Sequence, residues 1–167
     1  MKKIIITGGS GFIGSNLVNF LIKKKYFVIN IDKLTYSSNK YNNKKTNSKN
    51  YRLYKFDINN KNKFIQIIKK YKPEAIFNLA AETHVDRSID SPKNFIDTNI
   101  LGVFNILESI RYCKKKNIKV KLIHVSTDEV YGDIKKKYRS DENWSYEPSS
   151  PYSASKASAD HLVKSYI

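Results

Sequence analysis

Short apolar runs alternate with segments of helical periodicity along this chain, and the alternation limits the folds open to it. Five runs predict strands, at residues 2–7, 26–31, 51–56, 75–79 and 120–125. Apolar residues recur at helical spacing over residues 11–24, 61–71 and 92–116, and a last helix begins near Ser150 and runs to the end. Strands that alternate with helices are joined by right-handed crossovers into a parallel sheet covered on both faces. We therefore expect a doubly wound α/β fold, Rossmann-like, with about five strands.

The length of 167 residues is that of one domain, and we expect residues 1–167 to form one unit without internal repeats. Residues 37–50, rich in Asn, Lys and Ser, predict a solvated loop. No run approaches the roughly 18 apolar residues of a membrane span, and the start lacks a signal-peptide core, so we expect a cytoplasmic protein without a membrane partner. The single cysteine, Cys113, excludes an intrachain disulfide and a cysteine-built zinc site, and we expect no redox role for it.

The chain is strongly basic, with 31 Lys and Arg against 15 Asp and Glu and a net charge of +16. Such a balance raises nucleic acid, anionic membranes or polyanionic ligands as partners. The lysine runs are scattered, however, at residues 23–25, 44–45, 69–70, 114–116 and 135–137. Three of them close predicted helices, where lysine complements the negative end of the helix dipole. Arginine clusters interleaved with aromatic residues are absent, so we expect no nucleic-acid partner.

A glycine-rich segment, residues 7–14, lies between the first strand and the first helix. Three of its glycines fit the G-x-G-x-x-G pattern: Gly9, Gly11 and Gly14. Glycines there permit a tight turn and close approach of the backbone to a pyrophosphate at the helix N-terminus, although an ordinary glycine turn is an alternative. Asp32 closes the second strand, where an acid can bind both hydroxyls of an adenosine ribose. Together they predict NAD over NADP, with Lys33 as a residue that could attract a 2′-phosphate and soften the preference.

Tyr152 and Lys156 stand four residues apart, on one face of the last predicted helix. Ser150 can cap this helix and Pro151 can be its first residue. Tyr152 then sits in the first turn, where the helix dipole and the Lys156 ammonium favour phenolate, so we expect a lowered pKa and a base that works near neutral pH. A surface Tyr/Lys pair is the alternative, and the upstream nucleotide motif argues against it.

A hydroxyl and two carboxylates follow the fifth strand, at Thr127, Asp128 and Glu129. Residues just after parallel strands reach the ligand crevice of such a sheet. Two carboxyls there can divide acid and base roles if their environments separate their pKa values, whereas a solvated acidic loop is the alternative. No pair among the three histidines has metal-ligand spacing, and we expect no metal. These histidines are His84, His124 and His161.

These motifs resemble the extended short-chain dehydrogenase/reductase family and, within it, the dTDP-sugar 4,6-dehydratases. The segments that carry the resemblance, in order, are GGSGFIG, NIDKLTYS, LAAETHVDRSI, FIDTNILGVFNILE, HVSTDEVYGD and PSSPYSASKASADHLV. Together they cover essentially the whole chain. The glycine motif and the Tyr152/Lys156 pair are shared with sugar-nucleotide epimerases, whereas Thr127-Asp128-Glu129 is typical of the dehydratases.

The resemblance implies a lyase of nucleotide-sugar metabolism, in dTDP-rhamnose biosynthesis, that converts dTDP-glucose to dTDP-4-keto-6-deoxyglucose with NAD. It implies that Tyr152 takes the proton of the hydroxyl at sugar carbon 4 as that carbon is oxidised, and that Lys156 holds the nicotinamide ribose. Glu129 would remove the proton at carbon 5, Asp128 would protonate the hydroxyl that leaves carbon 6, and hydride would return to carbon 6. Thr127 would hydrogen-bond the reacting hydroxyl and orient Tyr152.

By the same resemblance a larger set of residues lines the cofactor, and two residues, Thr83 and Thr127, face the substrate. Thr83 stands where many relatives have Ser, which keeps the hydroxyl. The cofactor set comprises Gly8, Gly11, Phe12, Ile13, Gly14, Asp32, Lys33, Leu34, Thr35, Asp57, Ile58, Leu79, Ala80, Ala81, Thr83, Thr98, Tyr152 and Lys156.

Members of this family are longer chains, with a carboxyl-terminal region that binds the nucleotide diphosphate of the substrate. The resemblance therefore implies that these residues are the amino-terminal part. Because remote binding energy supports the reacting centre, we expect weak or no activity from this part alone. We also expect an open edge at the fifth strand. The family forms homodimers through the helices that correspond to residues 92–116 and 150 onward, and a shortened last helix should weaken that dimer. A related epimerase or decarboxylase and a non-catalytic NAD-binding fragment remain as alternatives.

Overall fold

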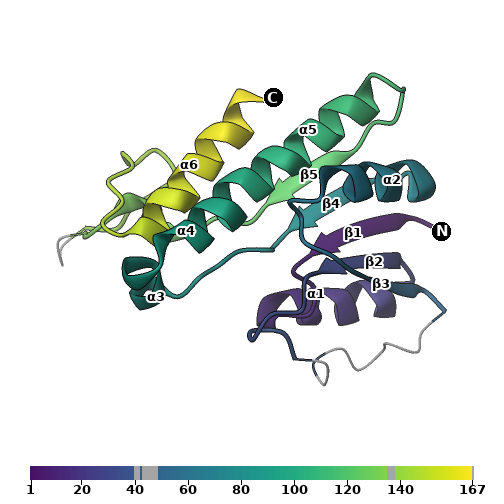
Figure 1. Ribbon diagram of the computed structural model, residues 1–167, viewed down its shortest axis with the longest axis horizontal. Coiled ribbons are helices and arrows are strands. Elements are labelled where there is room, and N and C mark those ends of the chain that lie inside the picture. The colour runs from purple at the N-terminus through teal and green to yellow at the C-terminus, as the bar shows by residue number, and fades with distance from the viewer. Residues whose placement is uncertain (40–41, 43–48, 135–137, 167) are drawn as a thin grey trace. The chain divides into compact units, whose positions relative to one another are not determined.

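The computed structural model describes residues 1–39, 42, 49–134 and 138–166 (Figure 1). Most of the predicted loop at 37–50 and the lysine runs at 44–45 and 135–137 lie outside the described residues. The elements in chain order are β1 (Lys3–Thr7), α1 (Phe12–Lys23), β2 (Phe27–Asp32), β3 (Tyr51–Lys55), α2 (Lys61–Tyr71), β4 (Ala75–Asn78), α3 (Val85–Asp90), α4 (Pro92–Phe95), η1 (Ile96–Leu101), α5 (Gly102–Lys114), β5 (Lys121–His124), η2 (Asp128–Tyr131) and α6 (Pro151–Ser165).

The five strands form one parallel sheet in the order β3-β2-β1-β4-β5 (Figure 1). This confirms the predicted doubly wound, Rossmann-like fold. The chain moves outward from β1 through β2 to β3 and then crosses back to β4 and β5 on the other side of β1. The direction of winding therefore reverses between β1 and β4, and ligands of such sheets bind outside the carboxyl ends of the strands at this point. β5 lies at one end of the sheet and pairs with β4.

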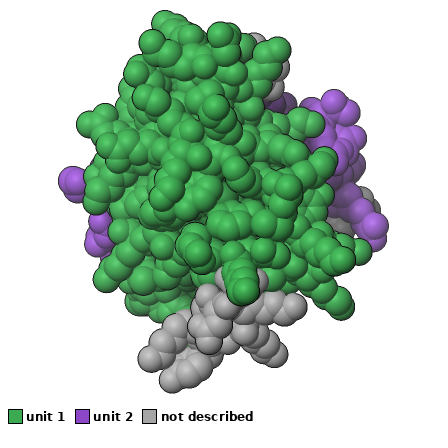
Figure 2. Space-filling model, turned by 90° about the vertical axis from the view of Figure 1, so that its right-hand side faces the viewer, with its two compact units in different colours: residues 1–80, 105–125 green, residues 81–104, 126–167 purple. Residues whose placement is uncertain are grey.

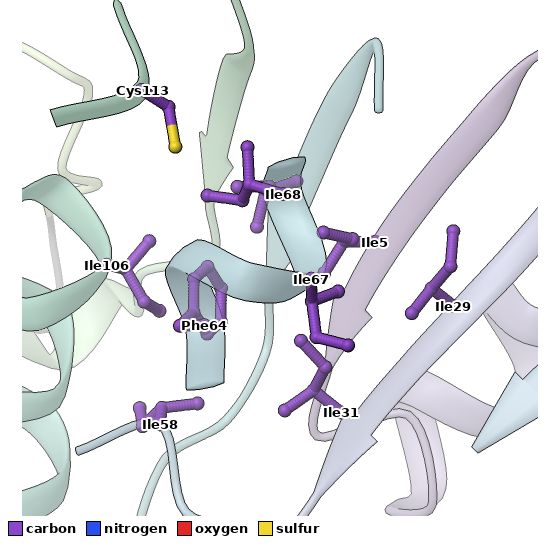
Figure 3. Close-up of a cluster of buried hydrophobic side chains, with 10 residues drawn as sticks. Ile5, Ile29, Ile31, Ile58, Phe64, Ile67, Ile68, Ile106 and Cys113 are labelled. Carbon is purple, nitrogen blue, oxygen red and sulfur yellow. The ribbon is translucent and has the colours of Figure 1, made fainter. Parts of the chain in front are cut away.

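Alternate residues of the central strands face opposite sides of the sheet, as the period of two in a strand requires. Ile4 and Ile6 of β1 pack with the buried face of α1. Ile5, between them, packs instead with residues of α2 and α5, including Phe64 and Ile106 (Figure 3). Cys113 of α5 is buried in this second cluster, where burial raises the pKa of its thiol. Helices thus cover both faces of the sheet.

Contacts divide the chain into two compact units (Figure 2). Unit 1, residues 1–80 and 105–125, holds the sheet with α1, α2 and most of α5. Unit 2, residues 81–104 and 126–167, holds α3, α4, η1, η2 and α6. A single domain over the whole chain remains a prediction.

The predicted helix over residues 92–116 is interrupted. It consists of α4, the π-helical segment η1 and α5. A π turn inserts one residue into the helical repeat and leaves the apolar pattern on either side intact, so periodicity did not show it. The short helices α3 and η2 were not predicted either, because helices of four to six residues are too short to display a period.

Lysines close three helices as the sequence predicts. Lys23 lies in the last turn of α1, Lys69 and Lys70 in that of α2, and Lys114 in that of α5. Cations at these positions complement the helix dipole, which accounts for part of the charge without a partner. Within the described ranges, no helix is both long and apolar enough to cross a membrane.

Candidate functional site

The glycine loop follows β1 and is held by close backbone packing within unit 1. Gly8 has a φ of +69°, and a Cβ there would lie 2.8 Å from the backbone nitrogen of Ala80, at the end of β4. A Cβ on Gly14 would approach the Gly8 carbonyl oxygen most closely and lie 2.8 Å from Cα of Gly9. Only glycine satisfies both positions, because Gly8 meets the loop after β4 and Gly14 meets the backbone of the glycine loop itself. The first of these contacts marks the reversal point of the sheet.

The helix that follows the loop begins without a side-chain cap. Gly11 is the N-cap of α1, and its first turn contains no acidic residue. By contrast, Ser150 caps α6 with its hydroxyl, and Ser153 returns the bond to complete a capping box. An uncapped N-terminus leaves backbone N–H groups and the positive dipole end available to an anion. The start of α1 therefore fits a phosphate group, and the start of α6 does not.

Asn30 of β2 holds the glycine loop through hydrogen bonds of its side chain. This residue was not predicted. Its side chain is fully buried. The oxygen Oδ1 accepts the N–H of Gly9 at 3.0 Å, and Nδ2 donates to the Ser10 hydroxyl at 3.1 Å and to the Tyr51 hydroxyl at 3.0 Å. A polar residue inside the apolar run of residues 27–31 is the sequence signal that could have found it.

Asp32 lies at the carboxyl end of β2, as predicted, and is 8% exposed. Its Oδ2 accepts the N–H of Ser10 at 2.9 Å. Its Oδ1 accepts the N–H of Leu34 at 2.8 Å and the Ser38 hydroxyl at 3.1 Å. These bonds fix the carboxylate beside the glycine loop, and an ionised carboxylate has about four acceptor sites, so capacity for a further donor remains.

Several other residues of the predicted cofactor set surround the carboxyl ends of the strands in unit 1. Lys33 Nζ lies 3.8 Å from Asp57 Oδ2 in an ion pair. Leu34 adopts a left-handed φ of 61°. Phe12 and Ile13 at the start of α1 are 80% and 64% exposed. Thr35 is half-buried, Ile58 is buried, and Leu79 and Ala80 follow β4.

Polar residues at the ends of β1, β4 and β5 form a second buried network. The Thr7 hydroxyl donates to Asn78 Oδ1 at 2.5 Å and accepts the N–H of Ala80 at 3.2 Å. The Asn78 amide nitrogen lies 3.0 Å from His124 Nδ1. The bonds of Thr7 fix the start of the β4 loop against β1, and His124 takes part in the same network.

Unit 2 holds the Tyr152/Lys156 pair on α6. Pro151 is the first helical residue after the Ser150 cap, so Tyr152 lies in the first turn and Lys156 one turn later, as predicted. Both side chains are buried, at 7% and 5% exposure. The Tyr152 ring packs edge-on against Phe95, with centroids 6.3 Å apart. The pair is therefore not a surface pair.

The predicted lowering of the Tyr152 pKa is wrong. Burial raises the pKa of Tyr152, a hydrogen bond with the Thr127 side chain opposes this, and the charges of Glu129 and Asp128 raise it further. The helix dipole and Lys156 favour the phenolate, as the prediction assumed. The free-energy cost of burying a phenolate beside two carboxylates is larger than this effect. Burial also lowers the pKa of Lys156 to about 8, and the charge of Asp160 counters part of this effect.

Residues Thr127–Glu129 form the start of η2. Thr127 is the N-cap, and its hydroxyl accepts the N–H of Glu129 at 3.3 Å. Asp128 and Glu129 are exposed, and both lie close enough to Tyr152 for their charges to act on its phenol. The structure therefore brings together within unit 2 all five predicted catalytic residues, and a hydroxyl, two carboxylates, a phenol and an amine can donate and accept protons there.

Asn99, in the π-helical segment, links two parts of unit 2 and was not predicted. Its side chain pairs with the backbone of Glu82, with both bonds 2.9 Å, and donates to the Ser155 hydroxyl at 2.9 Å. Glu82 lies between Ala81 and Thr83 of the predicted set. Thr83 is exposed, whereas Thr98, next to Asn99, is buried.

The sequence was compared with known families and with curated proteins. Residues 5–167 match the profile of a family described as GDP-mannose 4,6 dehydratase. The chain is 44% identical over 174 residues to the dTDP-glucose 4,6-dehydratase of Haemophilus influenzae, a match that covers 99% of this chain and 52% of that protein. The chain spans about half the length of the curated relatives it matches.

Solved structures show the same similarity. The crystal structure of dTDP-glucose 4,6-dehydratase from Bacillus anthracis in complex with NAD has a TM-score of 0.85 and 41% identity, covering 99% of this chain and 50% of that one. The UDP-glucose 4-epimerase of Thermus thermophilus, also in complex with NAD, has the same TM-score of 0.85 and 30% identity, covering 98% of this chain and 50% of that one. Backbone similarity therefore does not separate the two activities.

Proposed function

Because the chain belongs to the GDP-mannose 4,6 dehydratase family, we propose that it carries the cofactor-binding and catalytic residues of an NAD-dependent nucleotide-sugar dehydratase. The proposed substrate is dTDP-glucose and the product dTDP-4-keto-6-deoxyglucose. The names of the relatives support this choice, as does the crystal structure of one such enzyme with NAD. The full reaction belongs to proteins about twice as long, so both activity and substrate are proposals for this chain.

The glycine loop of unit 1 fits a dinucleotide. The uncapped start of α1 would bind the pyrophosphate through backbone N–H groups, and the packing of Gly8 and Gly14 leaves the loop free of side chains. Asp32 would accept the hydroxyls of the adenosine ribose. NAD, when bound, supplies the reversible oxidation of sugar carbon 4. The rest of the proposed cofactor lining is Phe12, Ile13, Leu34, Thr35, Asp57, Ile58, Leu79, Ala80, Ala81, Thr83 and Thr98.

The surroundings of Asp32 favour NAD over NADP. A 2′-phosphate would bring negative charge to a carboxylate that is already fixed by three donors. Lys33, the cation that could attract this phosphate, is paired with Asp57. A 2′-phosphate would have to compete with that carboxylate for Lys33. We therefore propose that Lys33 does not relax the preference for NAD.

Tyr152 is the proposed base for the carbon 4 hydroxyl, and Lys156 the group that would hold the nicotinamide ribose. The raised pKa of Tyr152 means that its phenol must gain a stabilising partner to ionise near neutral pH. The hydrogen bond with Thr127 already lowers the Tyr152 pKa, but burial outweighs it, so a further partner is needed. A positive charge on Lys156, one turn away, would favour phenolate as well.

The position of Asp128 and Glu129 beside Tyr152 is the observation that favours dehydration over epimerisation. Epimerisation at carbon 4 needs a base at that carbon, whereas loss of water also needs a base at carbon 5 and an acid at carbon 6. Both carboxylates stand close enough to Tyr152 to act on its pKa, which is where those two groups would be required. We assign Glu129 as the proposed base and Asp128 as the proposed acid, and Thr83 and Thr127 as substrate contacts.

The test is to incubate the purified chain with NAD and dTDP-glucose and to search by mass spectrometry for a product lighter by one water. We expect Glu129→Gln and Asp128→Asn to abolish this product. Asp133→Asn, which changes an exposed acid just beyond η2, serves as the matched control and should leave it unchanged. NAD binding, measured separately by calorimetry, should survive in all three variants.

Other outcomes would favour the alternatives. Conversion of the sugar to its carbon 4 epimer, without loss of water and insensitive to Glu129→Gln, would indicate an epimerase. NAD binding without any product would agree with the weak or absent activity expected of this part alone, and would leave a part of a dehydratase and a non-catalytic NAD-binding part as the two remaining functions. Failure to bind NAD, with dTDP-glucose unchanged, would reject the cofactor assignment itself.

A further inference from the structure

Helix α6 contains a buried carboxylate, Asp160, that the proposed chemistry does not use. Asp160 is 9% exposed and lies four residues after Lys156, in the interior of the helix. Aspartate is a poor residue inside a helix, and a buried carboxylate is costly unless it is hydrogen-bonded or paired. The neighbours of Asp160 must therefore offset this cost, and they identify the residues that the carboxylate fixes in place.

Two hydroxyls from outside the helix donate to the same oxygen of Asp160. Ser126 Oγ lies 2.5 Å and the Tyr146 hydroxyl 3.2 Å from Oδ2. Ser126 immediately precedes Thr127, so its bond fixes the start of the proposed catalytic segment to α6. Burial, with Asp160 as a further cause, raises the pKa of Tyr146 to about 12, so this hydroxyl stays a donor at neutral pH.

Tyr146 extends the attachment to the other end of the same segment. Its ring packs edge-on against Tyr131, the last residue of η2, with centroids 5.4 Å apart. The His161 ring centre lies 5.3 Å from that of Tyr146, and Lys164 Nζ lies 5.2 Å from the Tyr146 ring centre. The segment 127–131 is therefore held at its start through Ser126 and at its end through Tyr146, and both attachments meet at Asp160.

The charge of Asp160 also reaches Lys156, one helical turn earlier. Burial lowers the pKa of Lys156 to about 8, and the charge of Asp160 counters part of this lowering. Other charged residues stand on the elements packed against α6: Asp86, Arg87 and Asp90 on α3, Lys93 on α4, Asp97 on η1, and Asp128 and Glu129 on η2. Of the charges in the described ranges, that of Asp160 acts on Lys156 to keep it protonated.

We propose that Asp160 is a positioning residue of the catalytic centre, which ties residues 127–131 to helix α6 through hydrogen bonds and supports the Lys156 ammonium through its charge. The inference rests on the proposed function, because it assigns Asp160 to residues whose catalytic roles are proposed there. Asp160 touches no reacting atom and acts through Ser126, Tyr146 and Lys156. The two effects can be separated by substitution.

The test compares three variants of the full chain. Asp160→Asn keeps the shape of the side chain and removes the charge, whereas Ser126→Ala keeps the charge and removes one hydrogen bond. Asp90→Asn, an exposed acid of α3, is the matched control. The readouts are the titration midpoint of the Lys156 ammonium, followed by NMR in protein labelled with 15N-lysine and assigned by loss of the signal in Lys156→Met, and the backbone amide shifts of residues 127–131.

We expect Asp160→Asn to move the Lys156 midpoint to lower pH. Ser126→Ala should leave that midpoint in place and move the amide signals of residues 127–129, and Asp90→Asn should change neither. An unchanged Lys156 midpoint in Asp160→Asn would overturn the role of the charge. Unchanged amide signals in Ser126→Ala would overturn the role of the hydrogen bond.

If Asp160→Asn does not fold, Ser126→Ala and Tyr146→Phe carry the test, because both keep the carboxylate. They should then perturb opposite ends of the segment, residues 127–129 and Tyr131 respectively, and the absence of this pattern would refute the inference. Neither readout needs substrate. A wild-type chain that forms no dehydrated product would therefore leave the Asp160 result readable. Where product forms, Asp160→Asn should lower kcat and move the alkaline limb of the pH profile to lower pH, and Asp90→Asn should not.

Discussion

Replacing Gly14 by alanine should destabilise the fold, although the same change inside an ordinary helix would stabilise it. A Gly to Ala change in a helix interior gains about 1 kcal/mol. At Gly14 the new methyl would meet the carbonyl of Gly8 and lie 2.8 Å from Cα of Gly9. These are backbone atoms, and Gly8 is itself held against the Ala80 backbone, so neither side can yield. Overpacking of this kind costs about 1–3 kcal/mol, and we expect the upper end.

The assay is urea denaturation without any ligand, which separates packing from cofactor binding. With a slope of about 2 kcal/mol/M, a loss of about 3 kcal/mol lowers the urea midpoint by about 1.5 M. Gly11→Ser is the control, because a Cβ there meets only the Gly8 oxygen at 3.4 Å and serine is a favoured N-cap. Its midpoint should equal or exceed that of the wild type. A Gly14→Ala midpoint at or above wild type would refute the packing argument, and equal losses in both variants would refute its specificity.

Three further substitutions test the buried residues. Burial lowers the pKa of Lys156 to about 8, so the folded state releases this proton before the unfolded state, and stability should rise with pH between about 8 and 10. Lys156→Met should remove that rise and increase the free energy of unfolding at pH 7 by on the order of 2–3 kcal/mol. The measurement is urea unfolding of both proteins at about pH 7 and about pH 10. Asn30→Ala should cost about 1–3 kcal/mol, because it leaves buried hydrogen-bonding groups without their partner, whereas the exposed Asn16→Ala should change stability by less than about 0.5 kcal/mol. Ile106→Ala in the core should lower the free energy of unfolding by about 2–5 kcal/mol and lower the melting temperature with it. The exposed Ile89→Ala should change that free energy by less than about 0.5 kcal/mol. A larger loss for Ile89→Ala than for Ile106→Ala would contradict the core assignment.

The fold was predictable because, in a parallel sheet, each buried strand is a short apolar run and each covering helix has an apolar stripe, so the order of these patterns along the chain gives the order of the elements. Each of the five predicted strands is present within one or two residues of its expected ends. The central strands β1, β2 and β4 are largely buried and read as near-continuous apolar runs, whereas the edge strands β3 and β5 are more exposed. The π-helical segment was not predicted, and its residue Asn99 bonds to Glu82 and Ser155, which lie far away in the sequence. A local period carries no trace of such contacts.

The sequence predicted where Tyr152 and Lys156 lie on their helix, but not the direction in which the Tyr152 pKa shifts. Spacing on α6 gave the one-turn separation of Tyr152 and Lys156 and the Ser150 cap. It could not give the burial of Tyr152 against Phe95, and that burial decides the direction of the pKa shift. Asn30 and Asp160 were missed for a related reason, because their meaning depends on which hydroxyls and backbone groups the fold brings to them.

The π-helical segment η1 makes this chain sensitive to the deletion of a single residue. A π turn is an α-helix that carries one extra residue. Deleting a single residue between Ile96 and Leu101 would therefore allow regular helix from Pro92 to Lys114, and most helical hydrogen bonds would survive. Residues on one side of the deletion would rotate by about 100° relative to the other side. Asn99 could then no longer face both Glu82 and Ser155. A chain with this deletion would keep its helix but lose the attachment between α6 and the segment that leads to Thr83.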